Sequence, residues 1–171
     1  DLVFSWFGGY HALLPFSLAR VSGRKCVLVA SGYDVANLPE ISYGNMRPGV
    51  RRVIGRQVFG LADCVLAVSE FTRREAIRNA GVPAGKIEVV PHGVDAEQFH
   101  PGLGTKQIAQ VLTVGGVTEA TMRTKGLPEY VAVAASFPEI PFLVVGPQDE
   151  LAAAKLRRAA TPNVKFSGPL F

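Results

Sequence analysis

The sequence predicts an α/β fold made of two Rossmann-like parallel-sheet domains, each only partly present. Short apolar runs alternate with amphipathic helical stretches along the whole chain, which is typical of parallel strands joined by helical crossovers. One segment, residues 95–107, lacks any sustained period and contains Pro101, Gly102 and Gly104. We therefore expect two domains, at residues 1–103 and 104–171. The strand pattern begins at Asp1 without an initiator Met, so we expect that both ends of the protein are missing.

The first domain is expected to hold strands at residues 1–5, 26–30, 65–68 and 86–90. Helices are expected at residues 10–22, 50–61 and 70–80, and a long loop at residues 31–48. Residues 50–61 carry apolar side chains at helical spacing. Ser69 and Gly81 supply an N-cap and a C-terminal stop for the helix between them.

The second domain is expected to hold strands at residues 108–114, 141–145 and 164–166. Helices are expected at residues 125–137 and 150–160. Pro128 suits the first turn of the earlier helix, because its missing N–H would have no helical partner there. Residues 115–124 are expected to form a loop.

Charge and cysteine content restrict the cellular setting. The formal net charge of +4 and the pI near 9.3 favour anionic partners without choosing among them. Cys26 and Cys64 lie in apolar runs and are expected to be buried free thiols, which fits a reducing compartment. No apolar run reaches the roughly 18 residues that span a bilayer. We expect a cytoplasmic protein.

Seven arginines could contact an anionic membrane as a peripheral partner. The favoured alternative is that they lie on solvated helix faces. These are Arg47, Arg51, Arg52, Arg56, Arg73, Arg74 and Arg78.

The segment Lys-Ile-Glu-Val-Val-Pro-His-Gly-Val-Asp at residues 86–95, followed by Phe99 and Pro101, carries a family resemblance. It resembles the signature that joins the two domains of the family 4 retaining glycosyltransferases. The preceding residues 62–69, and the later motifs at residues 125–127, 142–146 and 163–168, match the same family in order. The resemblance implies the GT-B fold. In that fold the first domain mainly binds the acceptor and the second mainly binds the nucleotide-sugar donor.

Four residues in the second domain are candidates for binding the donor diphosphate: Gly115, Gly116, Arg123 and Lys125. A glycine pair after a strand lets the backbone approach a ligand, and a helix start offers free N–H groups to an anion. Arg123 and Lys125 would add full positive charges. Relatives commonly have Gly-Arg where this chain has Gly115-Gly116, so we expect Arg123 to replace the missing guanidinium. The alternative is that both cations are solvated loop residues.

In the first domain, Ser31 stands where many relatives place a His close to the transferred sugar, and the catalytic residue is therefore unknown. Asp34 keeps the acid of that pattern and is a candidate for contacting a hydroxyl group, against an alternative as a loop cap. His92, Gly93 and Asp95 are expected to line the cleft between domains, with loop packing as the alternative for His92.

The resemblance implies transfer of a sugar from a nucleotide diphosphate sugar to a glycan, lipid or small-molecule acceptor. Retention of configuration, no metal or other cofactor and no nucleic-acid partner are expected, and no Asp-x-Asp metal motif is present. The paired glutamates that bind the sugar in relatives are absent, so the isolated chain is expected to be inactive. The alternative is a non-catalytic GT-B-like binding or assembly domain. A Rossmann oxidoreductase is disfavoured because no G-x-G-x-x-G fingerprint occurs.

Overall fold

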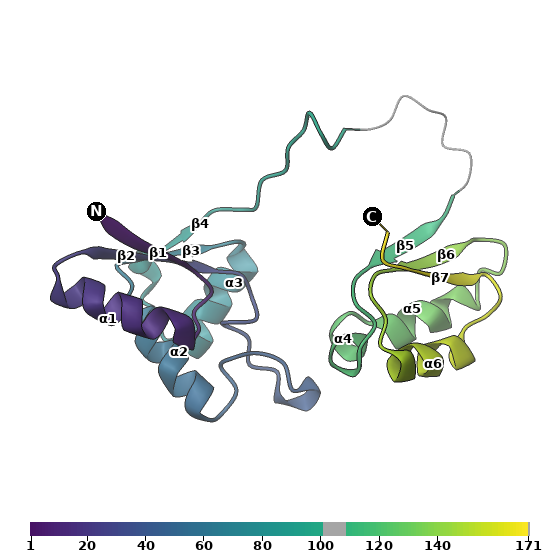
Figure 1. The fold of residues 1–171 in the computed structure, drawn as a ribbon, viewed down its shortest axis with the longest axis horizontal. Helices are drawn as coiled ribbons and strands as arrows, with labels where there is room; N and C mark the ends of the chain where they lie inside the picture. The colour runs from purple at the N-terminus through teal and green to yellow at the C-terminus, as the bar shows by residue number, and fades with distance from the viewer. Residues whose placement is uncertain (101–108, 171) are drawn as a thin grey trace. The chain divides into compact units, whose positions relative to one another are not determined.

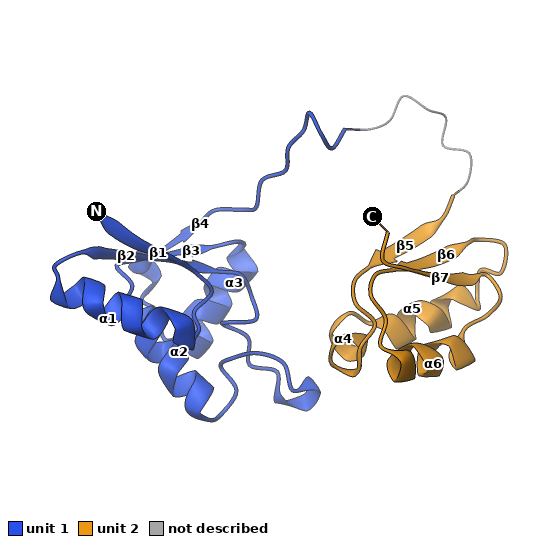
Figure 2. Ribbon diagram, viewed as in Figure 1, with its two compact units in different colours: residues 1–100 blue, residues 101–171 orange. Residues whose placement is uncertain are grey.

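The computed structural model describes residues 1–100 and 109–170, which belong to two compact units (Figure 2). Unit 1 is Asp1–His100 and unit 2 is Pro101–Phe171. The boundary expected at residues 103 and 104 lies outside the described residues. Each unit contains one parallel sheet with helices, which confirms the predicted α/β class.

Unit 1 is built on a four-stranded parallel sheet in the order β1-β2-β3-β4. The strands are β1 Leu2–Trp6, β2 Lys25–Ala30, β3 Cys64–Ala67 and β4 Ile87–Val89. The helices are α1 Leu13–Val21, α2 Val50–Leu61 and α3 Glu70–Glu75, the last continued by a π-helical turn at Ala76–Ala80. Because the strands follow one another in sequence order, right-handed crossovers place the helices on one face of the sheet (Figure 1). The strands and helices predicted for this half are confirmed.

The core of unit 1 lies between this sheet face and the helices. Phe16 of α1, Phe59 of α2 and Leu28 of β2 are its largest fully buried side chains from those elements. Cys26 is buried and Cys64 is partly buried, and both are free thiols. Burial raises the pKa of both thiols, so neither is activated as a nucleophile.

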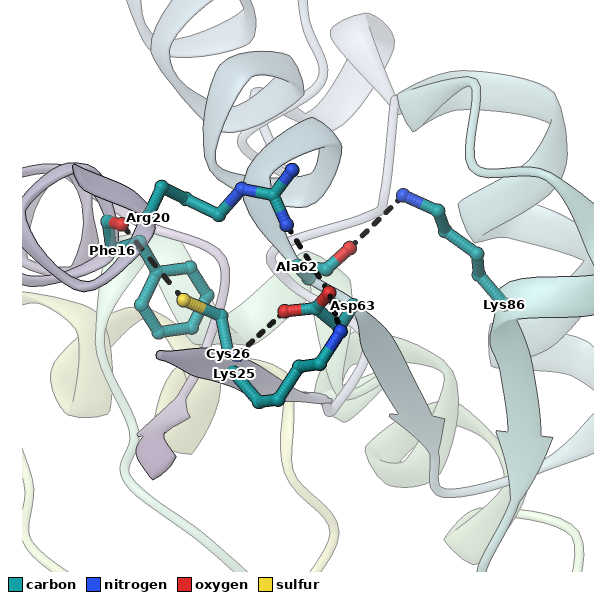
Figure 3. Close-up of polar contacts among 7 residues, drawn as sticks. All are labelled: Phe16, Arg20, Lys25, Cys26, Ala62, Asp63 and Lys86. Atoms are coloured by element: carbon teal, nitrogen blue, oxygen red, sulfur yellow. Dashed lines mark hydrogen bonds and ion pairs between the residues drawn. The ribbon is translucent and has the colours of Figure 1, made fainter. Parts of the chain in front are cut away.

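Asp63 joins three groups at the edge of the sheet where the strands begin (Figure 3). Its carboxylate accepts hydrogen bonds from the Cys26 N–H at 2.8 Å, Arg20 Nη1 at 3.1 Å and Lys25 Nζ at 3.2 Å. The Cys26 N–H, followed by the nearby Lys25 and Arg20 cations, holds the pKa of Asp63 below its usual value. This cluster lies at the edge opposite the one where the strands end, and it ties α1 to the starts of β2 and β3.

We expect Asp63→Asn to destabilise unit 1 by about 1 kcal/mol or more at pH 7, because both cations lose a charged partner. The pKa of Asp63 is lower in the folded than in the unfolded protein. Its stabilisation is therefore complete above the unfolded value of about 3.9 and is lost as pH falls through the folded pKa. Urea unfolding at pH 7 and at acidic pH, followed by fluorescence of the single tryptophan Trp6, measures this difference.

Glu70→Gln is the matched control, because Glu70 forms an exposed ion pair with Arg73 that should contribute less than about 0.5 kcal/mol. An Asp63→Asn difference that stays constant down to acidic pH would contradict the assigned role of the charge.

Unit 2 has a three-stranded parallel sheet in the order β5-β6-β7. The strands are β5 Val111–Val114, β6 Phe142–Val145 and β7 Val164–Gly168. The helices are α4 Glu119–Thr124, α5 Leu127–Ala134 and α6 Glu150–Ala159. Phe142 and Val144 of β6 pack against Val131 of α5 and Leu156 of α6 in its core.

The expected loop at residues 115–124 is wrong in its second half, where α4 forms. Thr118 explains the helix: its Oγ1 accepts a hydrogen bond from the Thr121 N–H at 3.2 Å, and Thr121 Oγ1 accepts one from the Thr118 N–H at 3.0 Å. This reciprocal pair is a capping box with Thr in place of the usual Glu. The helix expected at residues 125–137 is also shorter. Gly126 has φ +61°, a left-handed conformation that separates α4 from α5.

Over residues 1–100 and 109–170, the helices are too short or too polar to cross a bilayer.

Candidate functional site

The candidate residues of both units lie where the strands end. Gly115 and Gly116 follow β5, Ser31 follows β2, and His92 comes shortly after β4. In parallel sheets all strands end at the same edge, and open α/β folds bind ligands there.

In unit 2 two glycine-containing loops approach each other closely. The Gly115 N–H donates to Val145 O at 2.8 Å. Gly146, just after β6, has φ +139°, and a Cβ atom there would lie 2.3 Å from Gly115 O. Only glycine fits position 146, both because of its backbone conformation and because the neighbouring chain leaves no room. The close backbone approach at this edge therefore depends on Gly146 as well as on the expected pair. The sequence feature that could have indicated Gly146 is a glycine directly after the apolar strand at residues 142–145.

The Lys125 side chain lies near Gly115. It follows α4, and a Cβ atom added to Gly115 would be 3.7 Å from Lys125 Cε and 4.0 Å from Lys125 Nζ. Its ammonium group is exposed and donates no hydrogen bond to the described residues. The structure thus brings Gly115 and Lys125 together, and the exposed cation has no partner among the described residues.

Arg123 lies in the last turn of α4, two residues before Lys125. Its side chain is exposed, and its guanidinium forms no hydrogen bond or ion pair with the residues that the structure describes. Arg123 is therefore near the glycine pair in sequence, but no contact fixes its guanidinium there.

Gly116 is held by a side chain of α4. Thr121 Oγ1 donates to Gly116 O at 2.6 Å, and the same oxygen takes part in the capping box. The Thr118 and Thr121 N–H groups at the start of α4 are thus already paired within the protein. Positive charge at this edge comes mainly from Lys125 rather than from the start of this short helix.

In unit 1 Asp34 joins two loops. It is 1% exposed, and its carboxylate accepts hydrogen bonds from the N–H groups of Gly8 at 2.9 Å, Ser31 at 3.1 Å and Gly32 at 3.0 Å. Gly8 follows β1, whereas Ser31 and Gly32 follow β2. This geometry corresponds to the loop-capping alternative, because the carboxylate is buried and committed to backbone groups. Ser31 itself is partly exposed at the strand end.

His92 stacks on Trp6, with ring centroids 6.0 Å apart and planes at 14°. Both belong to a hollow of about 250 Å³ with mainly apolar walls. Its lining residues are Phe4, Trp6, Val29, Leu66, Val68, Val90, Pro91, His92 and Gly93. Sequence reasoning did not select Trp6, although an aromatic residue at the end of a strand was the available signal.

Asp95 has local partners. Its Oδ1 accepts hydrogen bonds from the N–H groups of Glu97 at 2.9 Å and Gln98 at 3.2 Å, which stabilises the turn at residues 95–98. Within residues 1–100 and 109–170, no three His, Cys, Asp or Glu side chains gather as a metal site would require.

Each unit has a parallel sheet with glycines after its strands, and solved structures of the GT-B class share this fold. Anabaena HepE in complex with UDP and glucose superimposes with a TM-score of 0.66 at 17% identity, over 98% of this chain and 48% of that one. The lipopolysaccharide outer core galactosyltransferase WaaB superimposes with a TM-score of 0.58 at 17% identity, over 98% of this chain and 44% of that one. The UDP-GlcNAc 2-epimerase of Neisseria meningitidis superimposes with a TM-score of 0.53 at 13% identity, over 99% of this chain and 49% of that one. This chain thus spans less than half the length of these proteins.

The family model described as Glycosyltransferase Family 4 matches residues 1–98. The chain therefore belongs to Glycosyltransferase Family 4. No curated protein sequence matched it.

Proposed function

We propose that this chain is part of a glycosyltransferase that moves a hexosyl group from a nucleotide diphosphate sugar to an acceptor hydroxyl. The observation that carries the proposal is the exposed Lys125 ammonium lying near Gly115, at the edge where β5 and β6 end. Family membership supports the class of reaction. Unit 2 would bind the donor, and unit 1 would bind a glycan, lipid or small-molecule acceptor.

The chemistry suits that arrangement. As the bond between sugar and phosphate breaks, negative charge develops on the departing nucleoside diphosphate, while the acceptor oxygen bonds to the anomeric carbon and its proton passes to the departing phosphate oxygen. A fixed cation near the diphosphate stabilises this charge more than it stabilises the intact donor. Lys125 would supply that charge, the Gly115–Gly116 backbone would allow close approach, and Arg123 would add a second cation.

Several finer features are part of the proposal and rest on the family resemblance. They are retention of configuration, a reaction without an obligatory metal, a cytoplasmic location with peripheral membrane contact, and inactivity of residues 1–171 alone. UDP is the first nucleotide to test, because the Anabaena HepE structure contains UDP and the Neisseria meningitidis epimerase structure contains UDP-GlcNAc.

For the acceptor side, the hollow beside Trp6 and His92 supports a binding role. Aromatic rings with exposed faces suit the apolar surface of a sugar ring or a lipid-linked acceptor. Asp34 would position the neighbouring loops rather than contact the substrate.

A transfer assay with the full-length protein tests the proposal. The protein is incubated with radiolabelled UDP- and GDP-sugars and a membrane extract as a source of acceptors, and both transfer and donor hydrolysis are measured. We expect the radiolabelled sugar of at least one donor to be transferred to an acceptor or released by hydrolysis. If no donor is used or hydrolysed, the proposed activity is excluded.

Calorimetric titration of the same protein with UDP and GDP distinguishes a transferase from the non-catalytic alternative. A binding or assembly domain should show no affinity for either nucleotide, whereas a transferase should bind one of them.

A further inference from the structure

The hydroxyl group of Thr121 connects the start of α4 with the loop after β5. Its Oγ1 accepts a hydrogen bond from the Thr118 N–H and also lies 3.0 Å from the Thr118 hydroxyl oxygen. The same oxygen lies 2.6 Å from Gly116 O, whereas the other carbonyl within reach, Thr118 O, is 3.3 Å away. A carbonyl oxygen can only accept, so Thr121 donates its proton to Gly116 O and the Thr118 hydroxyl donates to Thr121. The Thr121 hydroxyl is therefore fully used within the protein.

These bonds explain why Thr occupies a position that Glu usually takes in a capping box. A Glu carboxylate at position 121 would also accept from the Thr118 N–H. It has no proton to donate to Gly116 O, and its negative charge would lie at the edge proposed to bind a diphosphate. Capping α4 requires only an acceptor at this position. The donor bond to Gly116 therefore indicates a role of Thr121 beyond capping.

The loop and the end of α4 both depend on Thr121. Val117, the next residue of the loop, is fully buried, and its N–H donates to Pro147 O at 2.9 Å, which fixes the loop to the neighbouring strand end. In α4, the Lys125 N–H donates to Thr121 O at 2.9 Å. Thr121 thus holds Gly116 through its side chain and Lys125 through its backbone.

We propose that Thr121 is a positioning residue of the donor site, which sets the Lys125 cation against the Gly115–Gly116 backbone. The inference rests on the proposed function, because it assigns Thr121 a role only through Lys125. Thr121 does not contact the donor, since its hydroxyl is committed to Thr118 and Gly116. Without that hydroxyl, α4 is released from the loop and the ammonium group occupies a wider range of positions, which weakens its action on a diphosphate.

Thr121→Val in the full-length protein tests the proposal, because Val has nearly the same shape and helix propensity but lacks the hydroxyl. We expect kcat/KM for the preferred nucleotide sugar to fall about tenfold or more, and the Kd for UDP or GDP, whichever the wild type binds, to rise by a similar factor. A merely smaller folded fraction would lower the number of binding sites in calorimetry and leave their Kd unchanged. Thr121→Ser keeps the hydroxyl and should restore most of the loss.

Thr124→Val is the matched control in the same helix. The Thr124 hydroxyl contacts only carbonyl groups of α4, those of Ala120 and Thr121, at 3.3 and 3.2 Å. This variant should stay within about twofold of the wild type in kcat/KM, because no bond to the loop is lost. Equal activity of Thr121→Val and Thr124→Val would overturn the proposal.

A double-mutant cycle tests whether Thr121 acts through Lys125. Added to Lys125→Ala, Thr121→Val should change kcat/KM about twofold or less, because the cation that it positions is already gone. Effects of the two substitutions that simply multiply would overturn the proposal.

Hydrogen exchange of the amides in residues 115–126, measured by mass spectrometry on the same proteins, tests the anchoring without a substrate. Exchange should be faster in Thr121→Val than in Thr124→Val and the wild type, because α4 opens more often once it is released from Gly116. Unchanged exchange would overturn the anchoring whatever the activity. If the wild type uses and binds no nucleotide, the proposed function fails, whereas the exchange rates still decide whether Thr121 holds α4 to the loop.

Discussion

Replacing Asp34 by Ala is expected to destabilise unit 1 by about 3 kcal/mol or more. The change leaves the buried N–H group of Gly8 and the part-buried N–H groups of Ser31 and Gly32 without an acceptor, and a buried unpaired donor costs about 1–3 kcal/mol. A cavity adds to this cost, because Asp34 is almost completely buried. Asp34→Asn should also be destabilising, because its amide NH₂ would face a backbone donor where a carboxylate oxygen now accepts.

Urea unfolding followed by Trp6 fluorescence measures this effect, because the only tryptophan lies in unit 1. Two units need not unfold together, so a probe confined to one of them is required. Asp95→Ala is the matched control: Asp95 also accepts from two backbone N–H groups, but in an exposed turn, so its loss should cost under about 1 kcal/mol. Equal losses for the two variants would contradict the anchoring role of Asp34.

The Asp34 cluster illustrates what the sequence could predict. Its hydrogen bonds to Ser31 and Gly32 are local, within three residues, and belong to the loop-capping behaviour expected of Asp. Its bond to Gly8 spans 26 residues and depends on the parallel pairing that sets Trp6 beside Val29. Apolar periodicity predicts that both strands exist, but only the sheet register brings these two loops together.

The elements themselves followed from apolar patterns, because buried parallel strands and amphipathic helices have distinct periods. The pattern failed at α4, whose six residues are too few to show a helical period. There the capping pair Thr118 and Thr121 was the only local signal, and Thr at the second position is an unusual form of that motif.

The candidate phosphate residues were predicted from the glycine pair and the family resemblance, whereas their arrangement was not. The contact between Lys125 and Gly115 depends on the short α4 helix returning the chain across the strand end. The need for Gly146 depends on the neighbouring strand β6, which lies far away in sequence. Both are tertiary features that no single-segment pattern contains.

In the full-length protein, Lys125→Ala is expected to lower kcat/KM for the preferred nucleotide sugar by about 100-fold or more, typical for loss of one group that stabilises transition-state charge. The Lys125 ammonium lies near Gly115 and lacks a partner among the described residues, so its removal would take away the cation proposed to contact the diphosphate. The affinity for the free nucleoside diphosphate should fall as well. Initial-rate kinetics and calorimetry measure the two effects.

Lys155→Ala is the matched control, because Lys155 lies in the same unit and forms an exposed ion pair with Glu119. Its kinetics should match those of the wild type, because exposed ion pairs contribute little to stability. Arg123→Ala should give a smaller loss than Lys125→Ala, since no contact fixes the Arg123 guanidinium near Gly115. If Lys125→Ala and Lys155→Ala were equally active, the cation near Gly115 would have no part in binding the donor. Other groups would then have to bind the diphosphate, because the N–H groups of Gly115 and Gly146 already donate to Val145 O and Gly168 O.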